Sequence, residues 1–348
     1  MSRRQRRGHG RPTLQDVAQS AGVTRITVSR YIRRPELVAG ETAERIRAAI
    51  DATGYVPNHQ AGQLASGSSR IVAALIPNVG HSIFAETIQG LTEGLQDSGY
   101  ELLLSSTGYS LEREEQQLRA LLGWAPAALI VTGRRHTPAA ARLLRDAHAA
   151  GTPVIEIWDQ STGAGERGAL ARIGFDHQTI GRVMARHLLD LGHRSLAYVD
   201  SGVAEDYRAR ERGEGFAAEV RSRGAELHVV SAATGDAFEA GRALLDPLCD
   251  RRPPITAAAF ANDHLACGAL MEAQARGIAV PQRLALLGFG DFPIGRQLRP
   301  ALSTVRPPTA EIGRAAAASV LAFLRNGADP ESIVLDCELM RRDSTLGA

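Results

Sequence analysis

From residue 71 onward, the sequence alternates short apolar runs with longer segments of helical periodicity. Such runs suit strands that are buried on both faces, and strands that alternate with helices form parallel sheets with right-handed crossovers. The body of about 278 residues exceeds one comfortable sheet, so we expect an α/β fold of two doubly wound parallel-sheet subdomains with a cleft between them. The predicted strands lie at 71–77, 100–106, 127–132, 153–158, 195–200, 256–260 and 284–289.

One helical segment in this body shows its buried face clearly. Phe84, Ile88, Leu91 and Leu95 follow one another at intervals of four, three and four residues, which places them along one side of a helix. Gly99 comes next and is predicted to end this helix as its C-terminal cap.

The composition excludes several classes of enzyme. The sequence contains no lysine, so all 40 basic residues are arginine. Walker-A nucleotide-binding proteins, pyridoxal-phosphate enzymes and Schiff-base aldolases all need a lysine. The sequence also lacks the G-x-S-x-G, H-E-x-x-H and C-x-x-C motifs, and its ten histidines are scattered. We therefore expect no catalytic residues, no metal site and no cofactor.

Other features favour a cytoplasmic protein. The three cysteines are odd in number, lie far apart and form no C-x-x-C pair, so we expect them to be reduced. No apolar run reaches the roughly 18 residues that a membrane span needs, and the basic N-terminus lacks the apolar core of a signal peptide.

Basic charge is concentrated at the N-terminal end of the chain. Residues 1–70 contain 12 arginines and five acidic residues, a net charge of +7, while the remainder carries a net charge of −5. A basic head on an acidic body is typical of a nucleic-acid-binding protein, because clustered cations neutralise phosphates. A solvated basic tail is the alternative for the first four arginines, Arg3, Arg4, Arg6 and Arg7.

Residues 13–31 have the pattern of two short helices joined by a tight turn. Thr13 can cap the first helix together with Asp16, Gly22 permits the turn, and Thr24 can cap the second helix. Small residues at the contact let two helices cross closely, as a helix-turn-helix requires. The inward-facing residues are Val17, Ala18 and Ala21, then Val28 and Ile32, and finally Ile46 and Ile50 of a third helix at 40–54.

The outer face of the second helix is predicted to read bases in the major groove of DNA. A chance helical hairpin could copy the hydrophobic pattern, but here the spacing, the caps and the charge agree. The expected DNA-contacting residues of the two helices are Thr13, Thr24, Arg25, Ile26, Thr27, Ser29 and Arg30.

This stretch resembles the headpiece of the LacI family of bacterial regulators. The resemblance continues through Asn58 and then 59–65, which looks like the hinge helix of that family. It implies that Asn58 contacts DNA and that hinge helices of two subunits insert Leu64 between base steps of the minor groove. Gly62 departs from the family pattern, and a glycine inside a helix costs about 1 kcal/mol, so we expect this hinge to form only on DNA. An ordinary linker leucine is the alternative for Leu64.

The body resembles the periplasmic-binding-protein-like core of the same family. The matching motifs are Gly192-His193-Arg194, Ala261-Asn262-Asp263, Leu287-Gly288-Phe289 and the run 299–305. In that core, a small effector binds between two subdomains. The resemblance implies that Arg212 binds the effector, and its planar fork suits a carboxylate or paired hydroxyls. The further effector residues implied in the same way are Asn262, Asp263, Ser82 and Asp291, with capping or solvation as the alternative for the last three.

A third resemblance, to the gluconate-repressor branch of the family, rests on Trp124, the strand 129–132 and the run Arg135-His136-Thr137-Pro138. The runs 107–109 and 153–159 add to it. The loop that carries Arg134, Arg135 and His136 would place cationic donors near the cleft, as recognition of a sugar acid needs. The branch implies effector contacts from Arg135, His136 and Asp159, and a solvated loop is the alternative.

The sequence thus predicts a homodimeric repressor that binds a near-palindromic operator and responds to a sugar acid such as gluconate or ketogluconate. A regulator of a neutral sugar or nucleoside is the alternative, and a transport protein would have no use for the basic head. The expected divisions are a tail at 1–10, a headpiece at 11–58, a hinge at 59–70, and a core in which 71–170 and 304–328 form one subdomain and 171–303 and 332–345 the other.

Overall fold

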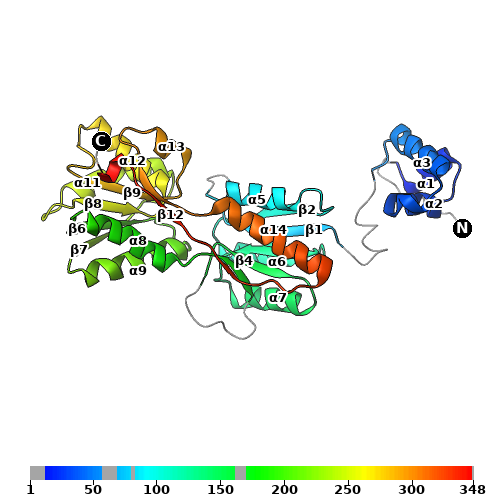
Figure 1. The fold of residues 1–348 in the computed structure, drawn as a ribbon, viewed down its shortest axis with the longest axis horizontal. Helices are drawn as coiled ribbons and strands as arrows, with labels where there is room; N and C mark the ends of the chain where they lie inside the picture. Colours follow the sequence, from blue (N-terminus) through cyan, green and yellow to red (C-terminus); the bar gives the residue numbers. More distant parts are fainter. Residues whose placement is uncertain (1–11, 57–68, 80–82, 161–169, 347–348) are drawn as a thin grey trace, which may run out of the picture. The chain divides into compact units, whose positions relative to one another are not determined.

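The structure is a computed structural model that describes residues 12–56, 69–79, 83–160 and 170–346. The chain divides after Ser69 into two compact units, each described here by itself (Figure 1). Across these described ranges, no helix combines the length and the apolar character that crossing a membrane requires. Nor do the same ranges contain a group of three or more acidic, histidine or cysteine side chains that could hold a metal ion.

The first unit is a small helical domain with the predicted helix-turn-helix. Thr13 caps the first helix in a capping box with Asp16, Gly22 ends that helix at a φ of 63°, and Thr24 caps the second helix. The predicted inner face is confirmed, since Val17, Val28 and Ile46 and their neighbours form one buried cluster. The elements are α1 (Leu14–Ala21), α2 (Arg25–Arg33), the 3-10 turn η1 (Pro35–Leu37) and α3 (Gly40–Thr53).

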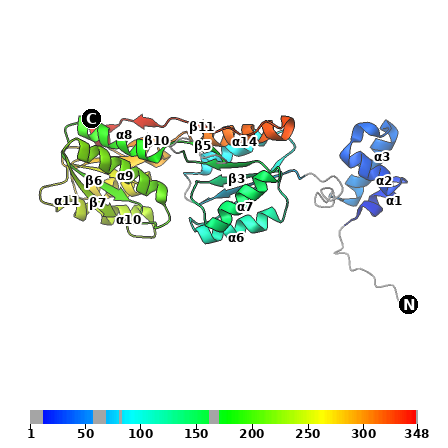
Figure 2. The same cartoon turned by 90° about the horizontal axis from the view of Figure 1, so that it is seen from below.

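The second unit begins with a six-stranded parallel sheet of order β11-β5-β4-β3-β1-β2. Helices α5 and α14 pack together on one face, and α6 and α7 cover the other (Figure 2). The strands are β1 (Ile71–Ile76), β2 (Glu101–Ser106), β3 (Ala128–Thr132), β4 (Val154–Ile157), β5 (Ala171–Gly174) and β11 (Ile333–Val334), and the helices are α5 (Ala85–Leu95), α6 (Leu111–Leu122), α7 (Pro138–Ala149) and α14 (Thr309–Asn326).

The other sheet of this unit has the order β12-β10-β9-β8-β6-β7, and only its edge strand β12 runs antiparallel. Helices α8 and α9 cover one face, and α10, α11 and α12 cover the other. The strands are β6 (Ser195–Asp200), β7 (Glu226–Ser231), β8 (Ala257–Phe260), β9 (Ala285–Phe289), β10 (Ser303–Arg306) and β12 (Glu338–Met340), and the helices are α8 (His177–Asp190), α9 (Tyr207–Ser222), α10 (Ala237–Ala243), α11 (Leu245–Cys249), α12 (Asp263–Ala275), α13 (Pro293–Gln297) and α15 (Asp343–Leu346).

All seven predicted strands are present, each with ends within one residue of the expected positions. The helix α5 buries the predicted face, but it ends at Leu95 and not at Gly99. Gln96 already has an extended ψ of 141° and Asp97 a φ of 58°, so the helical hydrogen bonding stops there. Gly99, with a φ of 78°, belongs to the turn before β2.

The chain passes between the two sheets three times, and these passages correct the expected subdomain boundaries. The strand β5 lies in the first sheet, so the first passage follows residue 174 and not 170. The strand β10 lies in the second sheet, so 304–306 belong there, and β11 lies in the first sheet, so 333–334 belong with it. These three strands are two to four residues long and carry too few apolar side chains to stand out in the sequence.

Candidate functional site

The helix α2 presents an exposed surface on the side opposite to the core of the first unit. Val28 is fully buried, whereas Arg25 and Arg30 are exposed and the apolar Ile26 is 70% exposed. Thr27 is half-buried, with its hydroxyl 2.9 Å from that of Thr24. An apolar side chain beside arginines fits contact with thymine methyl groups and phosphates.

Other members of the predicted DNA-contacting set are engaged within the headpiece. The Thr13 hydroxyl donates to the Asp16 carboxylate at 2.8 Å, so it serves as a helix cap. The Ser29 hydroxyl accepts a hydrogen bond of 3.0 Å from Arg33, one turn later on the same helix. Two predicted residues, Asn58 and Leu64, lie outside the described residues.

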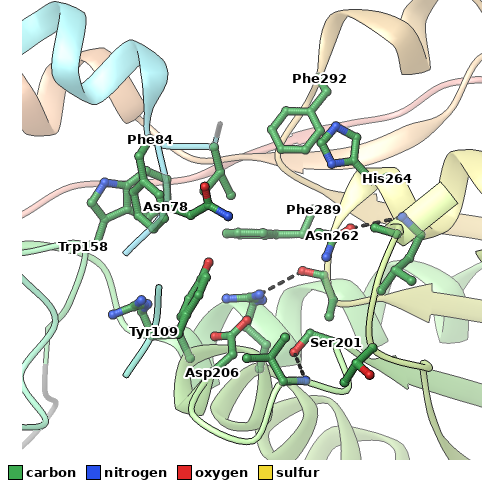
Figure 3. Close-up of a pocket in the computed structure, with 18 of the residues that line it drawn as sticks. Asn78, Phe84, Tyr109, Trp158, Ser201, Asp206, Asn262, His264, Phe289 and Phe292 are labelled. Atoms are coloured by element: carbon green, nitrogen blue, oxygen red, sulfur yellow. Dashed lines mark hydrogen bonds between the residues drawn. The ribbon is translucent and has the colours of Figure 1, made fainter. Parts of the chain in front are cut away.

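A cavity of about 290 Å³ lies where strands of both sheets end. Its lining includes residues that directly or closely follow five different strands: Asn78 after β1, Tyr109 after β2, Trp158 after β4, Ser201 after β6 and Asn262 after β8 (Figure 3). This position agrees with the rule that ligands in open α/β sheets bind beyond the carboxyl ends of the strands. Of the predicted effector residues, the lining contains Arg212 and Asn262.

Arg212 is held in place by three contacts. Its guanidinium carbon lies 4.0 Å from the centre of the Phe289 ring, and its nitrogens lie 2.8 Å from the Ala261 carbonyl oxygen and 3.0 Å from Nδ1 of His177. Its Nε is buried and makes no hydrogen bond to any described residue. Arg212 is therefore rigidly positioned, and its Nε–H has no hydrogen-bond partner among the described residues.

Arg208 lines the cavity one helical turn before Arg212 and was not among the predicted residues. It is buried, and among the described residues it makes no hydrogen bond or ion pair; its guanidinium instead lies 5.1 Å from the Tyr207 ring centre. Burial acts to lower the pKa of Arg208, but the neighbouring Tyr207 and Asp206 raise it, so the group stays cationic. Because no described residue accepts a hydrogen bond from the guanidinium, Arg208 can donate to a bound anion.

Polar and aromatic groups complete the lining. Asn262 caps α12 through its Oδ1, which accepts from the Leu265 amide at 3.0 Å, while its amide nitrogen bonds to no described residue. Asp206 caps α9 in the same manner and also lines the cavity. Burial raises the pKa of Tyr109 to about 12, so its hydroxyl stays protonated. The cavity therefore offers two guanidinium groups, a carboxylate and an amide among aromatic side chains, which suits a polyhydroxylated anion.

The predicted contacts of Arg135 and Asp159 with an effector are not supported, because neither residue belongs to the cavity lining. Both belong to an ion-pair cluster between the loop after β3 and α9. Arg134 lies 2.9 Å from Asp159 and 2.8 Å from Glu211, and Arg135 also lies 2.8 Å from Glu211. The Tyr207 hydroxyl accepts from the Arg134 amide at 2.8 Å and donates to Asp159. These cations bind carboxylates of the protein itself and link the two subdomains.

His136 is likewise a structural residue. Its Nδ1 lies 2.6 Å from Glu114 and its Nε2 lies 3.2 Å from Glu156, which in turn accepts from Arg172 at 2.6 Å. Burial would lower the pKa of His136, but hydrogen bonds to the two glutamates raise it to about 9. The imidazolium is therefore fully engaged and outside the cavity lining, contrary to the prediction.

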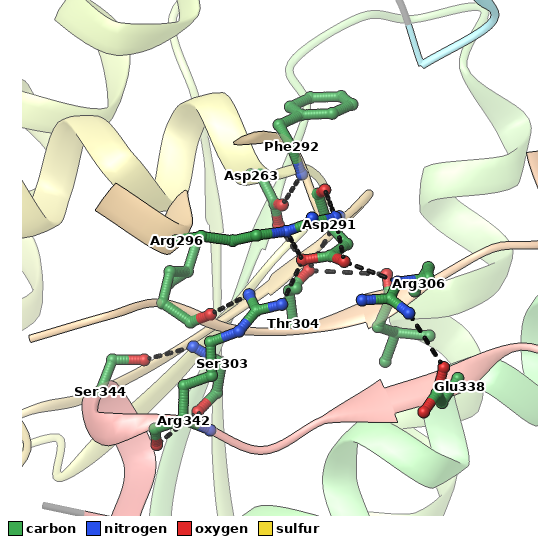
Figure 4. Close-up of polar contacts among 12 residues, drawn as sticks. Asp263, Asp291, Phe292, Arg296, Ser303, Thr304, Arg306, Glu338, Arg342 and Ser344 are labelled. Atoms are coloured by element: carbon green, nitrogen blue, oxygen red, sulfur yellow. Dashed lines mark hydrogen bonds and ion pairs between the residues drawn. The ribbon is translucent and has the colours of Figure 1, made fainter. Parts of the chain in front are cut away.

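Asp263 and Asp291 join neighbouring segments of the second subdomain through hydrogen bonds and ion pairs (Figure 4). Asp263 is fully buried and accepts from the Thr304 hydroxyl at 2.6 Å and from the Phe292 amide at 2.8 Å; burial raises its pKa to about 7. Burial would also raise the pKa of Asp291, but hydrogen bonds from three arginines lower it. Neither aspartate lines the cavity. The three arginines are Arg296, Arg306 and Arg342, and the predicted Ser82 lies outside the described residues.

One signal in the sequence could have identified Arg208. Arg208 and Arg212 are four residues apart on a helix that follows a strand, so both must point to the same side near the strand end. His177 gave no comparable signal, because its role depends on a partner 35 residues away.

Comparison with known proteins places this architecture in a family. Residues 13–58 match the model for bacterial regulatory proteins of the lacI family, and residues 185–345 match the periplasmic binding protein-like domain. The HTH-type transcriptional regulator GntR of Pseudomonas aeruginosa (strain PAO1) is 37% identical over 341 residues, which cover 97% of this chain and 96% of that protein.

Solved structures agree with the sequence comparison. A LacI-family transcriptional regulator from Silicibacter pomeroyi shares 32% identity and a TM-score of 0.88, with 96% of this chain and 99% of that chain covered. The transcriptional regulator CelR, solved as a cellobiose complex, shares 25% identity and a TM-score of 0.67, with 96% and 100% covered. The relatives are regulators and not enzymes. The chain therefore belongs to the LacI family of bacterial regulatory proteins and is a helix-turn-helix transcriptional regulator.

Proposed function

We propose that this regulator is a repressor controlled by a sugar acid, such as gluconate or a ketogluconate, bound in the cavity between the subdomains. The observation that carries the proposal is Arg208, a buried cation in the cavity wall without a hydrogen bond or ion pair to any described residue. The similarity to GntR supports it, since the sequence resembles the gluconate-repressor branch.

Different lining residues would bind different groups of the ligand. Arg208 and the partnerless Nε of Arg212 would bind the carboxylate, because guanidinium groups match carboxylates in shape and charge. Asp206 and the amide nitrogen of Asn262 would bind hydroxyl groups, one as acceptor and the other as donor. The aromatic side chains would cover the carbon chain of the ligand.

A neutral sugar or nucleoside is the second candidate. The aromatic rings of Phe84, Trp158 and Phe289 line the cavity and could stack on a sugar ring or a base. Such a ligand would offer the guanidinium of Arg208 no charged acceptor, whereas the carboxylate of a sugar acid would. The charge of the lining therefore favours the sugar acid.

Calorimetric titration of the purified protein with gluconate and glucose tests the proposal. We expect gluconate to bind at least about tenfold more tightly, because one charge-assisted hydrogen bond contributes about 1.5–3 kcal/mol. Arg212→Met should weaken the gluconate signal strongly. Equal affinity for the two sugars, or undiminished gluconate binding by Arg212→Met, would contradict the proposal and favour the neutral ligand.

On the DNA side, we infer that the protein acts in the cytoplasm as a homodimer on a near-palindromic operator, since two heads that read two half-sites require two-fold symmetry. Arg25, Ile26 and Arg30 are the exposed residues of α2 that would read the major groove. The caps Thr13 and Thr24 would orient the helices, Asn58 at the end of the headpiece would contact DNA, and Leu64 of the hinge would insert into the minor groove. Footprinting of a dimer-sized site checks this arrangement.

A further inference from the structure

His177 occupies the point where the chain first enters the second subdomain. It is the first residue of α8, three residues after the end of β5, and it is 1% exposed. Its Nε2 lies 2.9 Å from the carbonyl oxygen of Trp158, and its Nδ1 lies 3.0 Å from a guanidinium nitrogen of Arg212. A carbonyl can only accept and a guanidinium can only donate, so the proton is on Nε2 and Nδ1 is an acceptor.

The hydrogen bonding continues from Trp158 to the second passage between the subdomains. The indole Nε1 of Trp158 donates to the Thr87 hydroxyl at 3.0 Å, and that hydroxyl donates to the Thr309 carbonyl oxygen at 2.8 Å. Thr309 is the first residue of α14, directly after the chain has left β10. All of these residues are buried, so a chain of hydrogen bonds shielded from solvent joins Arg212 to the first and second passages of the chain between the sheets.

The backbone at Trp158 is held in a conformation that is rare for a bulky residue. Its φ is 67°, in the left-handed region that large side chains seldom adopt. A Cβ on Gly174 would lie 2.4 Å from the Asp159 nitrogen, so only glycine allows β5 to approach this segment so closely. Strain of this kind persists where the surroundings impose it, and the His177 bond is one of the contacts that do so.

We propose that His177 is a positioning residue, which fixes the orientation of Arg212 toward the ligand through Nδ1 and connects Arg212 to Trp158 through Nε2. The ligand part of this inference rests on the proposed sugar-acid function. In the wild-type protein, movement of Arg212 on ligand binding would be passed through His177 and Trp158 to the segments that join the subdomains.

The hydrogen bonds from Arg212 through His177 and Trp158 form a relay, and the electrostatic surroundings keep the His177 imidazole in the protonation state that this relay requires. Burial lowers the pKa of His177 well below its usual value, and the neighbouring Arg212, Arg208 and Arg134 lower it further, while the bond to the Trp158 carbonyl opposes them. His177 therefore stays neutral at physiological pH, and Nδ1 remains able to accept from Arg212.

Two substitutions separate the two bonds of His177. In His177→Asn, the amide can take the place of Nδ1 and accept from Arg212, but it is too short to reach the Trp158 carbonyl. In His177→Gln, the amide nitrogen can take the place of Nε2 and donate to that carbonyl, but Arg212 loses its acceptor. Calorimetry with gluconate should show near-wild-type affinity for His177→Asn and a loss of about tenfold or more for His177→Gln.

The fluorescence of Trp158 gives a second readout that needs no ligand. The chain contains two tryptophans, and the other, Trp124, is half-exposed and outside the cavity lining, so Trp124→Phe leaves Trp158 as the only indole. In that background, the emission maximum of the ligand-free protein should shift in His177→Asn and stay unchanged in His177→Gln. The variant whose emission shifts, His177→Asn, is thus the one that should keep its gluconate affinity.

A matched pair on α5 tests the next step of the relay. Thr87→Val removes the hydroxyl between Trp158 and Thr309 and should shift Trp158 emission while gluconate affinity is preserved. Thr92→Val is the control, since Thr92 lies on the same helix, is exposed and bonds only within its own turn. Should the wild type fail to bind gluconate, the sugar-acid proposal fails, whereas equal emission in both His177 variants and in both threonine variants overturns the relay.

Discussion

Replacement of Arg208 by methionine should weaken the binding of a sugar acid and lower the stability of the ligand-free protein. Methionine keeps much of the length and apolar surface of the arginine side chain but carries no charge. Arg208 has no hydrogen bond or ion pair to any described residue, but its neighbours Tyr207, Asp206 and Tyr109 raise its pKa despite burial, so the ligand-free protein already stabilises its charge. With a sugar acid bound, the same charge would meet the ligand carboxylate.

The expected magnitudes follow from this difference. Loss of a charge-assisted hydrogen bond worth about 1.5–3 kcal/mol should weaken gluconate binding by roughly 10- to 150-fold and leave glucose binding almost unchanged. The free energy of unfolding of the ligand-free protein should fall, because the replacement removes the attraction of Arg208 to Asp206 and its cation–π contact with Tyr207, the latter worth about 1 kcal/mol.

Calorimetry and chemical denaturation of three proteins provide the test. The wild type and Arg208→Met are compared with Arg210→Met, in which an exposed arginine two residues further on the same helix is replaced. The control should keep wild-type gluconate affinity. The reasoning is refuted if Arg208→Met is more stable than the wild type, or if it binds gluconate and glucose with unchanged preference.

Three further predictions concern DNA and pH. The logarithm of operator affinity should fall with the logarithm of salt concentration at a slope of several units, since each neutralised phosphate contributes about −0.9, and a flat dependence would contradict the proposed interface. Leu64→Ala should weaken operator binding without altering gluconate affinity. Arg25→Ala should instead change base preference in the half-sites, which selection of bound sequences from randomised DNA can measure. Burial and the nearby Arg341 lower the pKa of His187 to about 4, so its contribution to stability is present above the unfolded value near 6.5 and is lost as pH falls. The loss of stability between pH 7.5 and pH 5.5, measured by denaturation curves, should therefore be about 1 kcal/mol smaller in His187→Gln than in the wild type.

Most of the fold could be predicted from the sequence because apolar runs and helix-capping residues are local patterns. Most predicted strands are inner strands buried on both faces, which appear as apolar runs, and the caps Thr13 and Thr24 mark the helices of the headpiece. The apolar residues of the edge strand β7 are interrupted by His228, and β11 has only two residues, so neither stands out from its neighbours. Sheet membership of such strands depends on distant partners.

The ligand site was less predictable because the sequence does not show which residue pairs with a given charged side chain. Asn262 was found, since a polar residue directly after a buried strand must lie at the strand end. Arg135 and His136 also follow a strand, but they bind Glu211, Glu114 and Glu156, which come from other elements. Only the three-dimensional arrangement shows which cations the protein neutralises by itself and which it leaves for a ligand.

The three passages of the chain between the sheets set the order in which the protein can be completed during synthesis. A domain folds as a unit once its segments have left the ribosome, usually beginning from the N-terminus. The first sheet needs β11 and its covering helix α14, so it stays incomplete until residue 334 has been made, although it begins at β1. The helices of the headpiece, in contrast, are contiguous between residues 14 and 53. A nascent chain therefore carries a finished headpiece long before it has a body that can sense a ligand.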